Sequence, residues 1–324
     1  MDDQEKLITR REILVAGSGI GLAGALPILT AGTMPSNKMA DSSQAMDDID
    51  EEWKKVAAIF ETQGTIEPGD VLLIELPRSD IQATIFGVPI KPDLAIDTEI
   101  TFQHIDKKAI VKYEFVLRDE EVNPVLDALF AQDLQPATST LNALHNHFLE
   151  MTPHIKYLHG TSIGDPVDIA KALRKALSHT GTPFGNSSSK SEHLGFNPKQ
   201  IEEIIGGVGM ISDDVLSVSV ERVEKIRELG VTLQPAMQVE SMANFQSIGN
   251  GRVAVAGEII VLPQEADAVA RSLRCSGLFV TALHNHELFI EPNFYYLHTF
   301  ATGEPVELAE AIRKALNHTH SKFQ

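Results

Sequence analysis

Residues 143–159 read ALHNHFLEMTPHIKYLH, and residues 282–298 read ALHNHELFIEPNFYYLH. The two stretches align without a gap, so each carries three histidines at the same spacing. A motif that recurs along one chain indicates an internal repeat, and such a repeat decides how the fold is organised. The histidines are His145, His147 and His159 in the first copy, and His284, His286 and His298 in the second.

The similarity extends to both sides of the histidine motif. Upstream, residues 71–75 and 109–115 correspond to residues 215–219 and 253–259, and a Pro-initiated helix follows each motif after Pro166 or Pro305. Strands interleaved with helices, and strand pairs joined by turns, predict an α+β fold. We expect two tandem homologous α/β sandwich domains with mainly antiparallel sheets.

Each half is expected to contain the same order of elements: a helix, three strands, a helix, two strands and the closing helix. The expected ranges in the first half are 52–61, 71–76, 99–104, 109–117, 121–132, 139–147 and 154–159; those in the second half are 198–205, 215–220, 237–240, 253–261, 264–274, 277–286 and 293–298.

Composition shifts suggest how the chain is divided. Residues 178–192 are rich in Gly, Ser and Thr, as linkers are, and they lie between the two motifs. The predicted segments are a signal-like segment at 1–33, a flexible linker at 34–50, a first repeat domain at 51–180, a linker at 181–194 and a second repeat domain at 195–324.

The N-terminal segment has the pattern of an export signal. Arg10 and Arg11 precede a weakly hydrophobic, Gly- and Ala-rich run and then a polar exit, as in a twin-arginine signal. The run is short and glycine-rich, so we expect no stable membrane insertion after signal removal. The expected location is extracellular or in the cell envelope, and an uncleaved anchor helix is the alternative.

Charge and cysteine content exclude several classes of function. The chain of 324 residues has a formal charge of −18, which repels phosphate backbones, so we expect no nucleic-acid partner. A single cysteine, Cys275, allows neither an intrachain disulfide nor a thiolate metal cluster. The composition does not define an oligomeric state.

The spacing of the histidines favours a metal site. In a strand, His145 and His147 share one face, because residues i and i+2 do. A hairpin centred on residue 152 would place His145 opposite His159 and His147 opposite Tyr157; the second copy would place His284 opposite His298 and His286 opposite Tyr296. Three converging imidazoles suit a divalent transition metal such as zinc, iron, manganese or copper.

Other interpretations stay open at this point. Buried histidines held by hydrogen bonds would give the same sequence, and the protein would then be a non-catalytic envelope or ligand-binding module. One repeat could also keep the site while the other is a scaffold. Glu150 and Glu291 follow the histidine pairs and are secondary candidates, although they do not align with each other. A small-molecule ligand is compatible with each interpretation, and no catalytic residue is assigned.

The motif ALHNH, then Pro, then YLH, then Gly-Asp/Glu-Pro and a helix resembles the LppY/LpqO family of exported bacterial proteins, a domain-of-unknown-function family (DUF1259). The resemblance covers residues 50–180 and 195–320. It implies an exported bacterial protein of undetermined activity and brings no catalytic residues. The namesakes resemble lipoproteins, but this chain has no lipobox cysteine, so a lipid anchor is not implied.

Overall fold

The computed structural model describes residues 51–131, 138–185 and 194–324, and these described residues belong to one compact unit. The predicted signal-like segment at 1–33 and the linker at 34–50 lie outside the described residues, as does most of the linker at 181–194. Among the described helices, none is long and apolar enough to cross a membrane.

The first repeat forms a six-stranded sheet in the order β1-β2-β5-β6-β9-β7, and every neighbouring pair is antiparallel. Its strands are β1 (Thr65–Glu67), β2 (Val71–Pro77), β5 (Asp97–Ile105), β6 (Lys108–Arg118), β9 (Ile155–Gly164) and β7 (Thr138–His145). Its helices are α1 (Glu51–Ile59), α3 (Val122–Ala131) and α4 (Pro166–Leu177), with a 3-10 turn at Asp119–Glu121 before α3.

The second repeat forms an equivalent sheet in the order β10-β11-β14-β15-β18-β16, again antiparallel throughout. Its strands are β10 (Val208–Ser212), β11 (Val215–Val220), β14 (Ser241–Gly249), β15 (Arg252–Val261), β18 (Tyr295–Gly303) and β16 (Phe279–His284). Its helices are α5 (Pro198–Ile205), α6 (Ala266–Cys275) and α7 (Pro305–Leu316).

Each repeat also contributes a small three-stranded sheet. In the first repeat the order is β4-β3-β8, and in the second it is β13-β12-β17. The strands are β3 (Ala83–Ile85), β4 (Val88–Ile90), β8 (Met151–Thr152), β12 (Arg227–Glu228), β13 (Val231–Thr232) and β17 (Ile290–Glu291), and a short helix α2 (Pro92–Ala95) follows β4. In both repeats this sheet takes in the segment that joins the two histidine-bearing strands.

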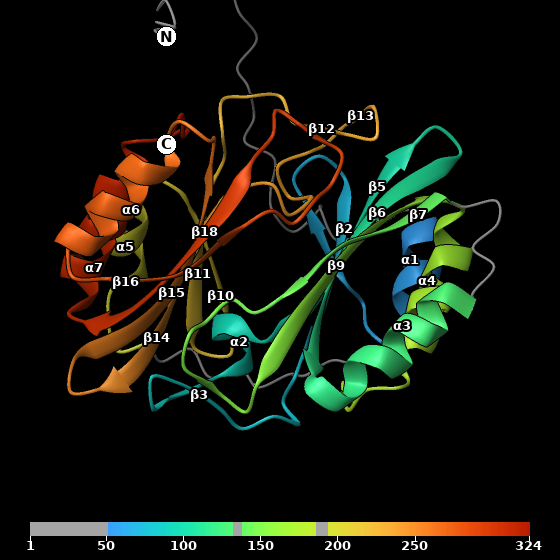
Figure 1. Ribbon diagram of the computed structural model, residues 1–324, viewed down its shortest axis with the longest axis horizontal. Helices are drawn as coiled ribbons and strands as arrows, with labels where there is room; N and C mark the ends of the chain where they lie inside the picture. Colours follow the sequence, from blue (N-terminus) through green and yellow to red (C-terminus); the bar gives the residue numbers. More distant parts are fainter. Residues whose placement is uncertain (1–50, 132–137, 186–193) are drawn as a thin grey trace, which may run out of the picture. The chain divides into compact units, whose positions relative to one another are not determined.

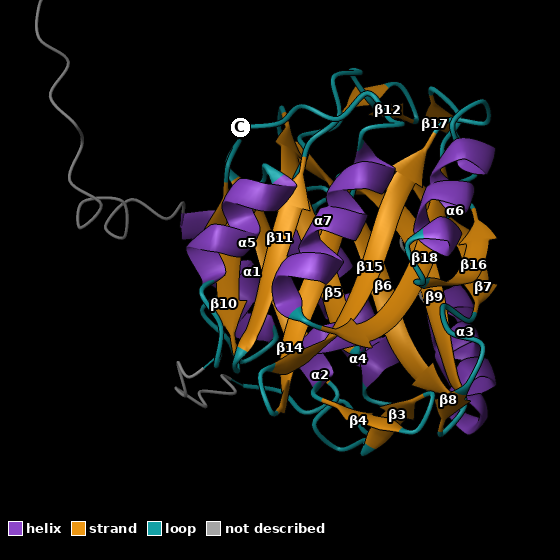
Figure 2. Ribbon diagram, turned by 90° about the vertical axis from the view of Figure 1, so that its left-hand side faces the viewer, coloured by secondary structure: helices purple, strands orange, loops and turns teal. Residues whose placement is uncertain are grey.

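The two large sheets face each other, and the helices cover their outer faces (Figure 1). Figure 2 shows α5, α6 and α7 in front of one sheet, with the other sheet behind it. One apolar core lies under α1, α3 and α4, and another lies under α5, α6 and α7. Two further apolar clusters combine residues of both repeats, so the inner faces of the two sheets are buried against each other.

A buried arginine recurs in each repeat where the chain leaves the second strand. Arg78 donates to both carboxylate oxygens of Glu121 at 2.9 Å, and Arg222 donates to those of Glu265 at 2.9 and 3.0 Å. Each glutamate also accepts a backbone N–H three residues before it, at 2.8 Å. These bidentate pairs fix the start of α3 and of α6 against the sheet.

The predicted α+β class, the tandem repeat and the antiparallel sheets are confirmed. One predicted element is wrong: residues 237–240 lie at and after a turn without forming a strand, and the strand begins at Ser241. The short strands of the small sheets were not predicted, because two or three residues carry no periodicity that could distinguish a strand from a loop.

Candidate metal centre

The histidine strands pair in a register two residues away from the one that the sequence predicts. Ala143, not His145, lies opposite His159, and His145 lies opposite Tyr157. The second repeat has the same pairing, with Ala282 opposite His298 and His284 opposite Tyr296. A shift of two residues keeps the same face, so the histidines still converge.

The physical reason for the shift is the course of the connecting segment. Met151–Thr152 does not fold back on β9 but pairs with β3, and Ile290–Glu291 pairs with β12. The connection is therefore a wide excursion and not a symmetric hairpin. His147 and His286 lie just beyond the ends of their strands, at the start of these excursions.

A tyrosine holds each of these two loop histidines in place. The His147 ring stacks on Tyr157 at 3.6 Å between ring centroids, and His286 stacks on Tyr296 at 3.7 Å. The Tyr157 hydroxyl donates to the carbonyl oxygen of Ala95 at 2.7 Å, so its polar end is directed away from the histidines. The tyrosines thus orient the imidazoles through their ring faces.

The closest contacts between the histidines join the two repeats. Three pairs of rings lie 3.7 to 3.9 Å apart between centroids: His145 with His284, His147 with His298, and His159 with His286. Within a repeat, the centroids are 4.8 to 5.9 Å apart. The two predicted clusters face each other and interleave, and we call the six rings the histidine cluster.

The ligand atoms of the cluster are close enough to share ions. One nitrogen from each of His145, His147, His284 and His286 lies within 4.8 Å of the others. Each repeat therefore contributes two of the four donors. Two further groups of this kind combine Glu114 with His159 and His286, and Glu258 with His286 and His298. The geometry therefore joins the six histidines to two carboxylates.

Glu114 and Glu258 are the site residues that the sequence reasoning missed. Glu114 lies opposite His159 on the neighbouring strand and Glu258 lies opposite His298, each with a carboxylate oxygen 3.6 Å from the imidazole. The signal was present, because both occupy the same position in the aligned stretches 109–115 and 253–259. The secondary candidates Glu150 and Glu291 are exposed and belong to none of these groups.

Most imidazole nitrogens of the cluster are buried without a hydrogen-bond partner. Seven are in this state among the described residues: both nitrogens of His145, and Nε2 of His147, His159, His284, His286 and His298. Burial, with His284 beside it, lowers the pKa of His145 to about 3, and burial lowers that of His284 to about 4. The imidazoles are therefore neutral, which is the form that binds metals.

A buried ion cluster closes one side of the site. Lys112 donates to Glu287 through a short hydrogen bond, and its Nζ lies 4.0 Å from Glu228. Tyr296 donates to Glu287 at 2.9 Å, and Thr161 donates to Glu228 at 2.7 Å. All three charged residues are at most 3% exposed.

The equivalent positions on the other side of the pseudo-symmetric site are apolar. Lys112, Glu228 and Glu287 correspond in the repeat to Ala256, Ile85 and Phe148, which lie together in one of the shared apolar clusters. Glu287 neutralises Lys112. Since the position equivalent to Lys112 is an alanine, the position equivalent to Glu287 needs no carboxylate. This explains the mismatch between Glu287 and Phe148 in the two motifs.

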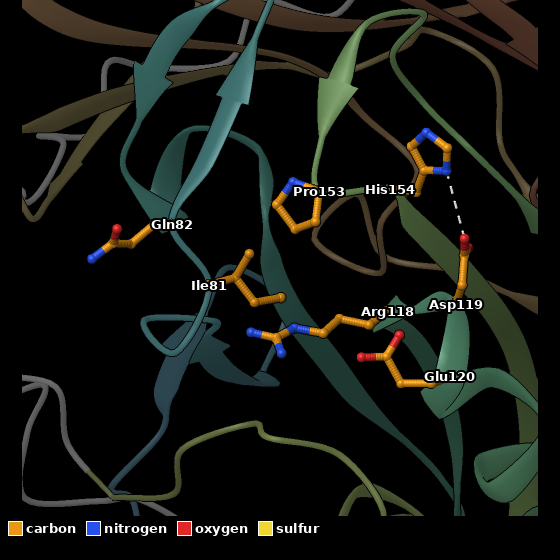
Figure 3. Close-up of a pocket in the computed structure, with 7 residues that line it drawn as sticks. All are labelled: Ile81, Gln82, Arg118, Asp119, Glu120, Pro153 and His154. Atoms are coloured by element: carbon orange, nitrogen blue, oxygen red, sulfur yellow. Dashed lines mark ion pairs between the residues drawn. The ribbon is translucent and has the colours of Figure 1, made fainter.

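A surface pocket at the far end of β6 is a different feature (Figure 3). It is lined by Arg118, Asp119 and His154 among others, and His154 pairs with Asp119 at 3.6 Å. The side chains of this pair are 80% and 52% exposed. Side chains this exposed to solvent are not held in place for binding a ligand, so the histidine cluster is the candidate metal centre.

A family model described as Domain of Unknown Function (DUF1259) matches residues 54–179 and 199–318. The chain belongs to this family. Both matched segments carry the histidine motif, so the family occurs here as two tandem copies. No curated protein and no solved structure matches the chain significantly.

The ion cluster gives a prediction about stability. Lys112→Ala alone leaves two buried carboxylates without their cation, and we expect it to destabilise the protein by about 3–5 kcal/mol. The triple variant Lys112→Ala, Glu228→Ile, Glu287→Phe copies the apolar side and should recover most of that loss. Urea unfolding measures both variants, and a triple variant less stable than the single one would contradict this account.

The lowered pKa values of His145 and His284 predict a pH dependence in chelator-treated protein. Below about pH 6.5 the unfolded chain protonates these imidazoles while the folded protein keeps them neutral, so their contribution to stability is lost as the pH falls. Relative to the His145→Gln, His284→Gln variant, the parent should lose up to about 1.4 kcal/mol per pH unit for each histidine between pH 6 and 4. Parallel stability curves would contradict the prediction.

Proposed function

We propose that the protein binds divalent transition metal at a single centre that both repeats build from the histidine cluster, Glu114 and Glu258. The observation that carries the proposal is the set of buried imidazole nitrogens without hydrogen-bond partners. Leaving a buried polar group unpaired costs about 1–3 kcal/mol, so a folded protein rarely keeps several together without a ligand. A metal ion would bind the lone pairs of these imidazole nitrogens, which no hydrogen-bond donor of the protein contacts.

The donor set suits a borderline metal. Imidazole binds zinc, iron, manganese and copper, and carboxylate oxygens complete such sites. Six imidazoles and two carboxylates exceed the four to six donors that one transition-metal ion usually takes. We therefore propose a capacity of up to two ions. The stacked Tyr157 and Tyr296 fix the ring orientations of His147 and His286, as groups behind metal ligands commonly do.

The alternative function is a non-catalytic module in which the histidines are a structural polar cluster. That interpretation requires ring nitrogens that are bonded to backbone or to hydroxyl groups. The neighbouring tyrosine hydroxyls are used elsewhere, on Ala95 and on Glu287 with the Gln238 carbonyl. Glu258 lies 3.6 Å from His298 and 3.9 Å from His286, which is beyond hydrogen-bond distance. These distances favour the metal.

A joint centre predicts how metal content responds to changes in one repeat. Untagged protein should carry at least one equivalent of transition metal by elemental analysis, and chelation should lower its melting temperature. The His145→Ala, His147→Ala variant alters only the first repeat. Because both repeats supply donors to the same ions, we expect it to lose most of the metal.

The matched control is His179→Ala, His318→Ala, which removes two exposed histidines outside the cluster and should leave the metal content unchanged. Loss of half the metal in the His145→Ala, His147→Ala variant would indicate independent sites. Metal-free parent protein whose melting is insensitive to chelator would support the structural alternative.

We infer further, from the sequence alone, that the protein is exported through its N-terminal segment. The paired Arg10 and Arg11 and the weakly hydrophobic run after them support this inference. In a bacterium with a twin-arginine pathway, the parent should be recovered outside the cytoplasm, and Arg10→Lys, Arg11→Lys should be retained inside. Cell fractionation measures the distribution, and equal distributions would argue against this route.

A further inference from the structure

A cavity of about 210 Å³ lies between the inner faces of the two sheets, next to the histidine cluster. His147 and His298 line it at the cluster, and Val208 and Met210 of the edge strand β10 line it as well. The last two side chains are exposed, at 53% and 40%. The cavity therefore connects the edge of the sandwich with the candidate metal centre.

A row of carboxylates crosses the first sheet along this cavity. Glu75 lies opposite Glu99 on the next strand, Glu99 lies opposite Glu114, and Glu114 lies opposite His159. Directly opposed residues have Cβ atoms about 5 Å apart, and like charges in such pairs repel. The second repeat replaces the first two members with Ser219 and Met242, so this part of the row is specific to one half.

The lining is rich in carboxyl groups and contains no cationic side chain among the described residues. Eight of the lining side chains are carboxylates, and none of the described lining residues is Lys or Arg. No ion pair links Glu75, Asp97 or Glu99 to a cationic side chain in the part of the chain that the structure describes. Burial, with Glu99 beside it, raises the pKa of Glu75 to about 8. A cation in the cavity would remove this cost.

Two observations independent of the carboxylates also indicate a ligand. Thr101 is 1% exposed and lines the cavity, and its hydroxyl has no hydrogen-bond partner. Asn244 also lines the cavity, and its buried Oδ1 atom is unpaired in the same way. Unpaired buried groups directed at one space are what a missing polar ligand leaves.

The spacing of the carboxylates favours an organic cation over a bare ion. Among the described residues, no three of the carboxylates remote from the histidines bring oxygen atoms within 4.8 Å of one another, as a metal would need. Leu73, Met242 and Phe148 add apolar surface to the same lining. The volume is several times the roughly 30 Å³ of a water molecule and below the 300 Å³ or more of drug-sized ligand sites.

We propose that the cavity binds a small aliphatic diamine or polyamine, with ammonium groups held by Glu75, Asp97 and Glu99 and the methylene chain against Leu73 and Met242. One end of the ligand would lie beside Glu114 and Glu258, at the histidine cluster. Binding itself needs no metal; only the role of this ligand as a substrate or regulator of the centre rests on the proposed function.

The test is calorimetric titration of chelator-treated full-length protein with 1,4-diaminobutane and with spermidine. We expect saturable binding of at least one of them and none of 1,4-butanediol, which has the same chain without charge. Glu75→Gln and Glu99→Gln should each weaken binding at least tenfold, and Glu310→Gln, at an exposed position on α7, should not change it. Ser217→Leu, which fills the cavity from β11, should also abolish binding.

Several results would overturn the proposal. They are the absence of amine binding to folded parent protein, equal binding of the diol, or amine binding that Glu75→Gln, Glu99→Gln and Ser217→Leu all leave intact. Saturable Ca²⁺ or Mn²⁺ binding that depends on Glu75 and Glu99, without competition by either amine, would assign the cavity to an inorganic ion. The titrated protein has been stripped of metal by the chelator. Amine binding can therefore be observed even if the protein has no metal centre, and a metal centre can exist even if no amine binds.

Discussion

The burial of six imidazoles between two sheets is the constraint on which the rest of the structure depends. Four of these histidines are buried and two, His145 and His284, are half-buried, yet most of the ring nitrogens have no hydrogen-bond partner in the described structure. Such a cluster is stable only if the surrounding fold holds the rings together and a ligand uses their lone pairs. The antiparallel sheets supply the scaffold, because each carries its histidines on the face that meets the other repeat.

The duplicated fold is symmetric at the centre and asymmetric around it. His159 and Glu114 have counterparts in His298 and Glu258, so the donors recur. The flanks differ: Lys112, Glu228 and Glu287 are charged on one side, and their counterparts are apolar on the other. All three contacting residues differ together between the two repeats, so no charged side chain is left in the apolar set and none lacks a partner in the charged set.

The two large sheets also differ at one pair of facing residues, where a change in size on one strand is matched by the opposite change on its neighbour. A Cβ at Gly160 would overlap the Tyr113 ring, which lies across it in the first repeat. In the second repeat, Thr299 takes the place of Gly160 and Gly257 takes the place of Tyr113. The glycine therefore lies on the neighbouring strand. One large and one small residue fill each location, as close packing requires.

The sequence predicted the fold better than it predicted the site. Long periodic segments such as 109–117 and the helix after Pro166 were identified because their patterns persist over several turns or strand residues. The face of His145 was correct because an even shift preserves it, but its register was wrong because the excursion through Met151–Thr152 depends on a distant strand. Glu114 and Glu258 could have been found by asking which acidic residues recur in both halves. The interleaving of the repeats could not, since nothing local in either motif encodes how two sheets meet.

The most direct test of a joint centre is a crystal structure of the untagged protein with anomalous-scattering data collected at the absorption edge of the bound metal. The account predicts an anomalous peak among the ring nitrogens of His145, His147, His284 and His286, with bonds of about 2.0–2.1 Å to imidazole nitrogens from both repeats. Peaks each bonded to one repeat alone, or an empty cluster with hydrogen-bonded imidazoles, would contradict it.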